Sequence, residues 1–300
     1  MALPSEDSLR FIVARMASIL AAHGEAFDAP PLVLPNAEFF PDAISVSGDG
    51  LETLLARIAF HSPLPDDVPL TLGFVEAEEA GGKSCSSGAC GPEGAALLPP
   101  VHETDETYLI PLDVSVARNP VRLTTAIARG VGGVLLAYTD TPLEDPSRDA
   151  EIAAVLSGFG VLLANGANLF MKGCSGVKVH RGTALTVEEV AAALALFVRR
   201  FDHAPSKAKK YLEPTQLEAF DEALAWADQN EELLEKLASA PELLADGVFE
   251  FGKPKGMLSR LFGKKPKDED VVVTVRKRTP EEERRLAEAR ALVEEALGGE

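Results

Sequence analysis

The chain has 300 residues, of which 46% are hydrophobic and three are cysteine. These figures exclude a disordered chain, a collagen-like repeat and a disulfide-dense scaffold, and they allow one large domain or two modest ones. The net charge is −18, because 47 Asp and Glu residues outnumber 29 Lys and Arg residues. Such a charge repels phosphate backbones and anionic lipids, which argues against nucleic-acid binding or membrane coating by the body of the molecule.

The N-terminus differs from an export signal. Glu6 and Asp7 stand where a secretory signal would be basic, and no cleavage pattern follows an apolar core. No run of apolar residues approaches the length of a membrane-spanning helix, so we expect no membrane span. In a chain without the pattern of an export signal, three cysteines are typically reduced thiols. We therefore expect a cytoplasmic protein.

A first helix and then four further elements are predicted before the centre of the chain. Ser5 is a plausible N-cap for that helix, and Gly24 is its predicted end. Residues 76–100 contain five Gly and three Pro without periodicity, which predicts an exposed, mobile loop. The other expected elements are a strand over 32–34, a helix over 51–60, a strand over 68–75 and a strand over 107–112.

The second half of the chain is predominantly helical in pattern. Asn119 followed by Pro120 predicts an N-cap with proline in the first turn, and the apolar pattern continues to Leu136. Strands early and helices late predict an α+β fold. The further elements expected are helices over about 149–165 and 186–201, two or three helices within 213–245, an alternating run over 271–275 and a last helix after Thr279.

Basic residues are concentrated near the C-terminus. Residues 253–278 hold nine basic and three acidic residues, between segments that are acidic. Several glycines and prolines accompany this change of composition. We therefore expect a linker or docking tail after a folded body.

Five segments carry a family resemblance. They are Phe39-Phe40-Pro41-Asp42, the strand 108–112, the helix 123–136, the Gly-Phe-Gly helix 158–165 and Lys210-Tyr211-Leu212. In this order they resemble an uncharacterised bacterial branch of the zincin-like metallopeptidases, over roughly residues 30–230. The resemblance implies short N-terminal strands followed by a mostly helical zincin-like core and a helical C-terminal extension.

The resemblance also implies a division of the chain into three parts. Residues 1–204 would form a zincin-like α+β domain that includes the loop 76–100. Residues 205–247 would form a helical extension. Residues 248–300 would form a basic linker, a short strand and a terminal helix.

Zincins carry the motif HExxH on the first of these helices, where two histidines on one face hold zinc and the glutamate activates water. The matching residues are Arg129-Gly130-Val131-Gly132-Gly133. Arg129 stands at the first ligand position, and Gly130 and Gly133 provide no side chain for the base and the second ligand. Glu151 corresponds to the carboxylate of the second helix. The resemblance therefore implies a degenerate site with neither catalytic residues nor a bound metal.

Three glycines within four helical positions need a physical reason, because each costs about 0.5–1 kcal/mol relative to alanine. One explanation is a break that divides the helix at 130–133. The other is close packing of this small-residue face against Ala154, Ser157 and Gly158 of the next helix. We hypothesise that backbone contact closes the space of a metal site, with Arg129 paired to Glu151 or turned to solvent.

The cysteines offer an alternative chemistry. Cys85 and Cys90 are separated by four residues, and with Cys174 and either His102 or His180 they could supply four ligands to zinc. A disulfide or a redox-sensing pair is a second possibility. Unpaired thiols, with Cys174 packed as a small apolar residue, are the third.

The basic segment 253–267 contains a short amphipathic pattern. Its apolar residues recur at positions that share one face of two helical turns, and cations such as Arg260 surround them. This face could lie on anionic lipid or dock into an acidic groove, or it could anchor a solvated linker on the body. The apolar residues are Met257, Leu258, Leu261 and Phe262.

These observations lead to two hypotheses. The first is a zincin-like protein that has lost its catalytic residues, has no cofactor and acts as a binding or scaffold protein for another protein. The second is a metal-dependent or thiol-dependent enzyme whose site lies at Cys85, Cys90 and Cys174, with zinc as the cofactor.

Overall fold

The computed structural model describes residues 3–42, 47–75, 97–173 and 176–252. The chain divides into two compact units, Met1–Pro254 and Lys255–Glu300, and all described residues lie in the first unit. The predicted run 271–275, the last helix, the amphipathic face 257–262 and most of the loop 76–100 therefore lie outside the described residues.

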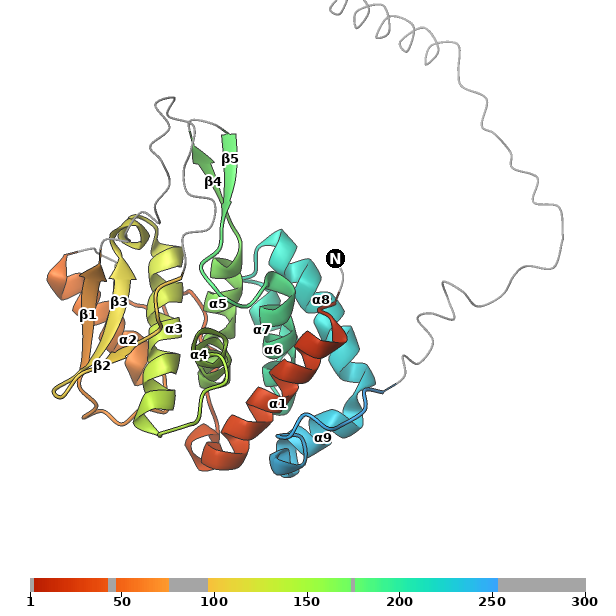
Figure 1. Cartoon of the computed structure of the whole chain (residues 1–300). Helices are drawn as coiled ribbons and strands as arrows, with labels where there is room; N and C mark the ends of the chain where they lie inside the picture. Colours follow the sequence, from red (N-terminus) through yellow and green to blue (C-terminus); the bar gives the residue numbers. More distant parts are fainter. Residues whose placement is uncertain (1–2, 43–46, 76–96, 174–175, 253–300) are drawn as a thin grey trace, which may run out of the picture. The chain divides into compact units, whose positions relative to one another are not determined.

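The α+β class is confirmed, with a helical majority and few strands (Figure 1). The first half of the chain contains α1 (Glu6–His23), α2 (Gly48–Phe60), β1 (Leu70–Val75), β2 (His102–Glu103), β3 (Tyr108–Asp113) and α3 (Pro120–Tyr138). The second half contains α4 (Pro146–Ala154), α5 (Gly160–Ala167), β4 (Leu169–Gly173), β5 (Gly176–His180), α6 (Val187–Arg200), α7 (Pro205–Lys209), α8 (Pro214–Gln229) and α9 (Glu231–Ser239).

The small sheet has the order β1-β3-β2 and lies beside α3 (Figure 1). β1 runs parallel to β3, with Leu72 opposite Ile110, whereas β2 is antiparallel to β3. The buried Ile110 faces α3 and packs against Gly130. β4 and β5 form a separate antiparallel hairpin that the sequence did not predict.

Local capping explains where two central helices begin. The Asn119 side chain accepts hydrogen bonds from the amides of Val121 and Arg122 at 2.9 and 3.1 Å, as its sequence position predicted. Thr186 and Glu189 form a complete capping box at the start of α6. Both predicted starts are confirmed.

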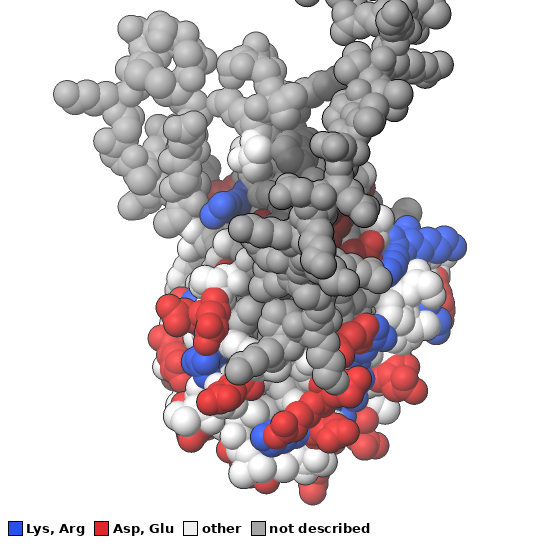
Figure 2. Space-filling model, turned by 90° about the vertical axis from the view of Figure 1, so that its right-hand side faces the viewer, with Lys and Arg blue, Asp and Glu red and all other residues white. Residues whose placement is uncertain are grey.

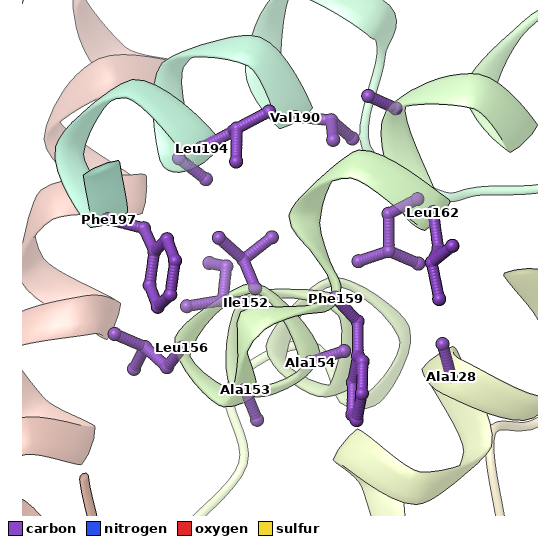
Figure 3. Packing of buried hydrophobic residues seen from close by; sticks show 14 of the residues in the cluster. Ala128, Ile152, Ala153, Ala154, Leu156, Phe159, Leu162, Val190, Leu194 and Phe197 are labelled. Carbon is purple, nitrogen blue, oxygen red and sulfur yellow. The ribbon is translucent and has the colours of Figure 1, made fainter. Parts of the chain in front are cut away.

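The core surrounds the consecutive helices α4 and α5, which are joined by a π-helical turn at Val155–Phe159. Figure 3 shows Ile152 and Leu156 of this stretch on the side of Leu194 and Phe197 of α6, whereas Phe159 points toward the side of Ala128 on α3. The single helix predicted over 149–165 is wrong in one respect, because Gly158 interrupts it with φ +95°. A side chain at Gly158 would overlap the carbonyl of Pro31.

The same contact explains why the strand predicted over 32–34 is wrong. The amide of Val33 donates to the carbonyl of Gly158 at 3.1 Å, so this extended segment bonds to a helical turn instead of a strand. Leu32, Val33 and Leu34 are buried as the apolar pattern required. The apolar pattern indicated burial correctly. It could not indicate the hydrogen-bond partner of the segment, because that partner lies in a distant part of the chain.

The C-terminal helices belong to the same compact unit as the rest of the described chain. α8 packs along α6, and Arg10 of α1 donates to the carbonyls of Gly247 and Phe249. The helices that we assigned to an extension over 205–247 therefore share a core with residues 1–204. Asp and Glu side chains predominate over Lys and Arg on the lower part of the face in Figure 2.

One stretch within the described residues, Pro146–Ala167, is long and apolar enough to pass for a membrane span by length and composition. It is the α4–α5 stretch at the centre of the core, and 94% of its apolar window is buried inside the protein. Burial among other helices explains its apolar composition without a lipid environment.

Candidate functional site

The helix that carries Arg129, Gly130 and Gly133 is continuous. α3 runs without interruption from Pro120 to Tyr138, through all three glycines. A break at 130–133 is therefore wrong as the reason for these glycines. Arg129, Gly130 and Gly133 are all buried within this helix.

Close packing is the reason that the structure gives instead. A Cβ atom at Gly132 would overlap the carbonyl of Ala150 and would lie 2.8 Å from the amide nitrogen of Ala154, both on α4. Such contacts are shorter than carbon atoms tolerate, and backbone atoms cannot rotate away from them. The predicted contact with Ala154 is confirmed, whereas Ala150 takes the place of Ser157 and Gly158.

The other two glycines face different neighbours. A Cβ atom at Gly130 would overlap the side chain of Ile110 on β3, and one at Gly133 would lie 2.9 Å from Pro100. The glycines of α3 thus fit against α4, against the sheet and against the segment that leads into β2. No space for an additional ligand side chain is left at these positions.

Arg129 pairs with Glu151, which is one of the two arrangements predicted for its side chain. Its Nε donates to Glu151 Oε1 at 3.0 Å, and its remaining nitrogens donate to the carbonyl of Leu98 at 2.7 Å and to Ser147 Oγ at 2.9 Å. The side chains of Arg129 and Glu151 are 6% and 0% exposed. The pair joins α3, α4 and the segment before β2 in a buried position.

Glu151 also holds the segment that leads into α6. The amides of Ala184 and Leu185 donate to Oε1 and Oε2 at 2.7 and 2.8 Å. Together with Arg129, these donors engage both oxygens of the carboxylate. Glu151 therefore connects α4, α3 and the segment before α6 through direct hydrogen bonds, which indicates a structural role for this side chain.

Burial changes the proton affinity of both partners. Removal from water raises the pKa of Glu151 to about 7, although Arg129 and the two backbone amides act in the opposite direction. The pKa of Arg129 is lowered by the same loss of solvent. The pair thus contributes a buried group that titrates near neutral pH.

These residues do not fit a zinc ion. Zinc prefers imidazole, thiolate or free carboxylate ligands, whereas Arg129 offers a guanidinium group and Gly133 has no side chain. Both oxygens of Glu151 already accept hydrogen bonds, from Arg129 and from backbone amides. Arg129 and Glu151 therefore form an ion pair with each other and offer no ligand set to a metal.

The alternative thiol site cannot be assembled from the described residues. Cys85, Cys90 and Cys174 lie outside them. His102 is exposed on the short strand β2, and His180 lies at the end of β5. Within the described ranges, no group of three His, Cys, Asp or Glu residues could hold a metal ion.

Two further ion pairs of α4 were missed by the sequence reasoning. Arg15 of α1 lies 2.9 Å from Asp149, and Arg148 lies 2.9 Å from Glu189 of α6. Asp149 also accepts hydrogen bonds from the amides of residues 144 and 145. The sequence did contain a sign of these pairs, because Arg148, Asp149 and Glu151 cluster at the start of an otherwise apolar helix. Charges that are buried with such a helix require partners of opposite charge.

Comparison of the whole chain with models of known protein families, with curated proteins and with solved structures finds no match.

Proposed function

We propose that this protein is a cytoplasmic binding or scaffold protein that acts on protein partners. We further propose that its core is that of a zincin-like metallopeptidase without catalytic residues. The observation that supports this proposal is the buried Arg129–Glu151 pair, because the resemblance assigns these two residues to the positions of a first ligand and of the carboxylate on the second helix.

A guanidinium group supports a structural interpretation better than a catalytic one. Arg129 stays charged over the accessible pH range and cannot act as a general base. All three of its nitrogens have partners within the protein. Neither the charge nor the hydrogen bonds of Arg129 are available to a substrate, so we assign the residue to the fold.

Metal analysis of the purified full chain tests this proposal. The expected result is that no stoichiometric zinc is retained after dialysis against a weak chelator. The same measurement on a Cys85→Ser, Cys90→Ser, Cys174→Ser variant separates the two possible locations of a metal. One tight zinc per chain in this variant would contradict the proposal, because no thiol could hold it.

The second candidate function remains an enzyme whose site is built from the three cysteines. Only the sequence favours it, through the separation of Cys85 and Cys90 by four residues. Zinc that is retained by the natural chain and lost from the serine variant would favour this alternative over the first proposal.

The basic segment 253–267 is the proposed contact with partners. Its apolar face is Met257, Leu258, Leu261 and Phe262, and Arg260 contributes to the surrounding positive charge. An acidic protein groove is the preferred target, and an anionic membrane is the alternative. Flotation of the full chain with phosphatidylserine vesicles, compared with a Leu261→Asp, Phe262→Asp variant, tests for the membrane. Flotation of the natural chain alone would favour lipid over protein.

A further inference from the structure

A surface cavity of about 280 Å³ lies at the C-terminal end of α6, away from the Arg129–Glu151 pair. Cavities that bind drug-sized ligands are usually larger, with volumes of about 300–1,000 Å³, so this one suits a ligand the size of a small metabolite. The residues that line it are Asp28, Ala29, Pro30, Arg200, Phe201 and His203.

The polar wall of the cavity is held in place by contacts behind it. Arg200 uses its Nε to donate to the carbonyl of Leu237 at 3.0 Å, and its guanidinium carbon lies 4.8 Å from the centre of the Phe201 ring. His203 Nε2 lies 3.0 Å from the carbonyl of Pro30, and its ring stacks on Phe197. Both side chains are therefore oriented before any ligand arrives.

The histidine contributes less positive charge than an ordinary histidine does at the same pH. Burial lowers the pKa of His203 below its ordinary value, in spite of the hydrogen bond to Pro30. The main charges that line the cavity are thus one guanidinium group, from Arg200, and one carboxylate, from Asp28.

These two charges have no oppositely charged partner in the described part of the chain. Within the described residues, Arg200 and Asp28 form no ion pair with each other or with another side chain. The two Nη groups of Arg200 have no hydrogen-bond partner in the same part of the chain. A cavity with one free charge of each sign favours a ligand that also carries both.

We propose that this cavity binds a free α-amino acid as its zwitterion. The carboxylate of the ligand accepts hydrogen bonds from the Nη groups of Arg200, and its ammonium group donates to Asp28. A small apolar side chain contacts Phe201 and Pro30. A simple anion is repelled by Asp28 and a simple cation by Arg200, so neither satisfies both walls of the cavity.

Titrations of the full chain with three related probes test this assignment. L-Alanine carries both charges, propionate lacks the ammonium group, and ethylamine lacks the carboxylate. Shifts of the backbone amide NMR signals of residues 28–29 and 200–203 report binding. We expect these signals to shift and then saturate as L-alanine is added. Propionate and ethylamine should bind at least about tenfold more weakly, because each lacks one charge-assisted hydrogen bond.

Matched variants locate the binding. Arg200→Gln and Asp28→Asn should each weaken L-alanine binding about tenfold. Arg199→Gln is the control, because Arg199 lies at the same end of α6 but pairs with Asp228 at 2.6 Å. Asp28 is exposed and forms no ion pair with another described residue, so Asp28→Asn leaves the fold intact.

Three outcomes would overturn the assignment. Amide signals that stay unchanged at high L-alanine concentration would show that the cavity binds no amino acid. Propionate that binds as tightly as L-alanine would indicate a site for anions alone. Equal weakening by Arg199→Gln and Arg200→Gln would place the binding outside the cavity.

Discussion

Replacement of Gly132 by alanine tests how closely α3 packs against α4. On an exposed helix, this change stabilises by about 1 kcal/mol, because glycine has the greater backbone freedom in the unfolded chain. At Gly132 the new Cβ would overlap the carbonyl of Ala150 and would lie 2.8 Å from the amide nitrogen of Ala154. Relief of both contacts requires α3 and α4 to separate.

The expected magnitude follows from these two opposing effects. Insertion of a methyl group into a well-packed core costs about 1–3 kcal/mol, and the upper end applies because both neighbours are backbone atoms. After the gain in helix propensity, we expect Gly132→Ala to lower the free energy of unfolding by about 2 kcal/mol. Separation of the helices would also lengthen the Arg129–Glu151 contact.

Urea unfolding measured by circular dichroism gives this free energy directly. Gly48→Ala is the matched control, because Gly48 begins α2 and has nothing within 4 Å of its would-be Cβ among the described residues. We expect this control to leave stability unchanged or raise it by up to about 1 kcal/mol. A Gly132→Ala variant that is as stable as the control would refute the close approach of α3 and α4.

The other predictions concern the buried pair and a helix end. Because burial raises the pKa of Glu151 from 4.5 to about 7, the unfolding free energy should fall by about 3 kcal/mol as the pH rises through this interval. Glu151→Gln should abolish that fall, and an unchanged pH dependence in urea unfolding would contradict the assignment. Arg129→Met leaves Glu151 buried without its cation and should cost about 3–5 kcal/mol at pH 8, with a smaller loss at pH 5, by the same assay. Thr186→Ala removes the capping box of α6 and should lower the thermal stability by about 1 kcal/mol, whereas an unchanged melting temperature would show that the cap contributes little.

Elements with local determinants could be predicted from the sequence. Asn119 and the Thr186–Glu189 box fix helix starts through hydrogen bonds within a few residues, and both were predicted. The strand at β3 followed from its apolar pattern. The interruption at Gly158 was missed, because its positive φ depends on the approach of Pro31 from another part of the chain.

The candidate site could be predicted only in part. The sequence located Arg129 and Glu151 through the family resemblance and gave their pairing as one of two alternatives. It could not show that the amides of Ala184 and Leu185 complete the environment of Glu151, because these donors lie on a segment that α6 positions. The Arg15–Asp149 pair was missed for a similar reason, since no local pattern links two charges on helices distant in sequence.

Hydrogen–deuterium exchange at the amides of Gly130, Gly132 and Gly133 tests the central claim most directly. If α3 is a continuous helix closed against α4 and the sheet, these amides should exchange only through global unfolding, as slowly as the amides of Ile127 and Val134. Exchange that is much faster at the three glycines than at Ile127 and Val134 would reveal a local opening. That result would contradict a closed, structural role for this part of the molecule.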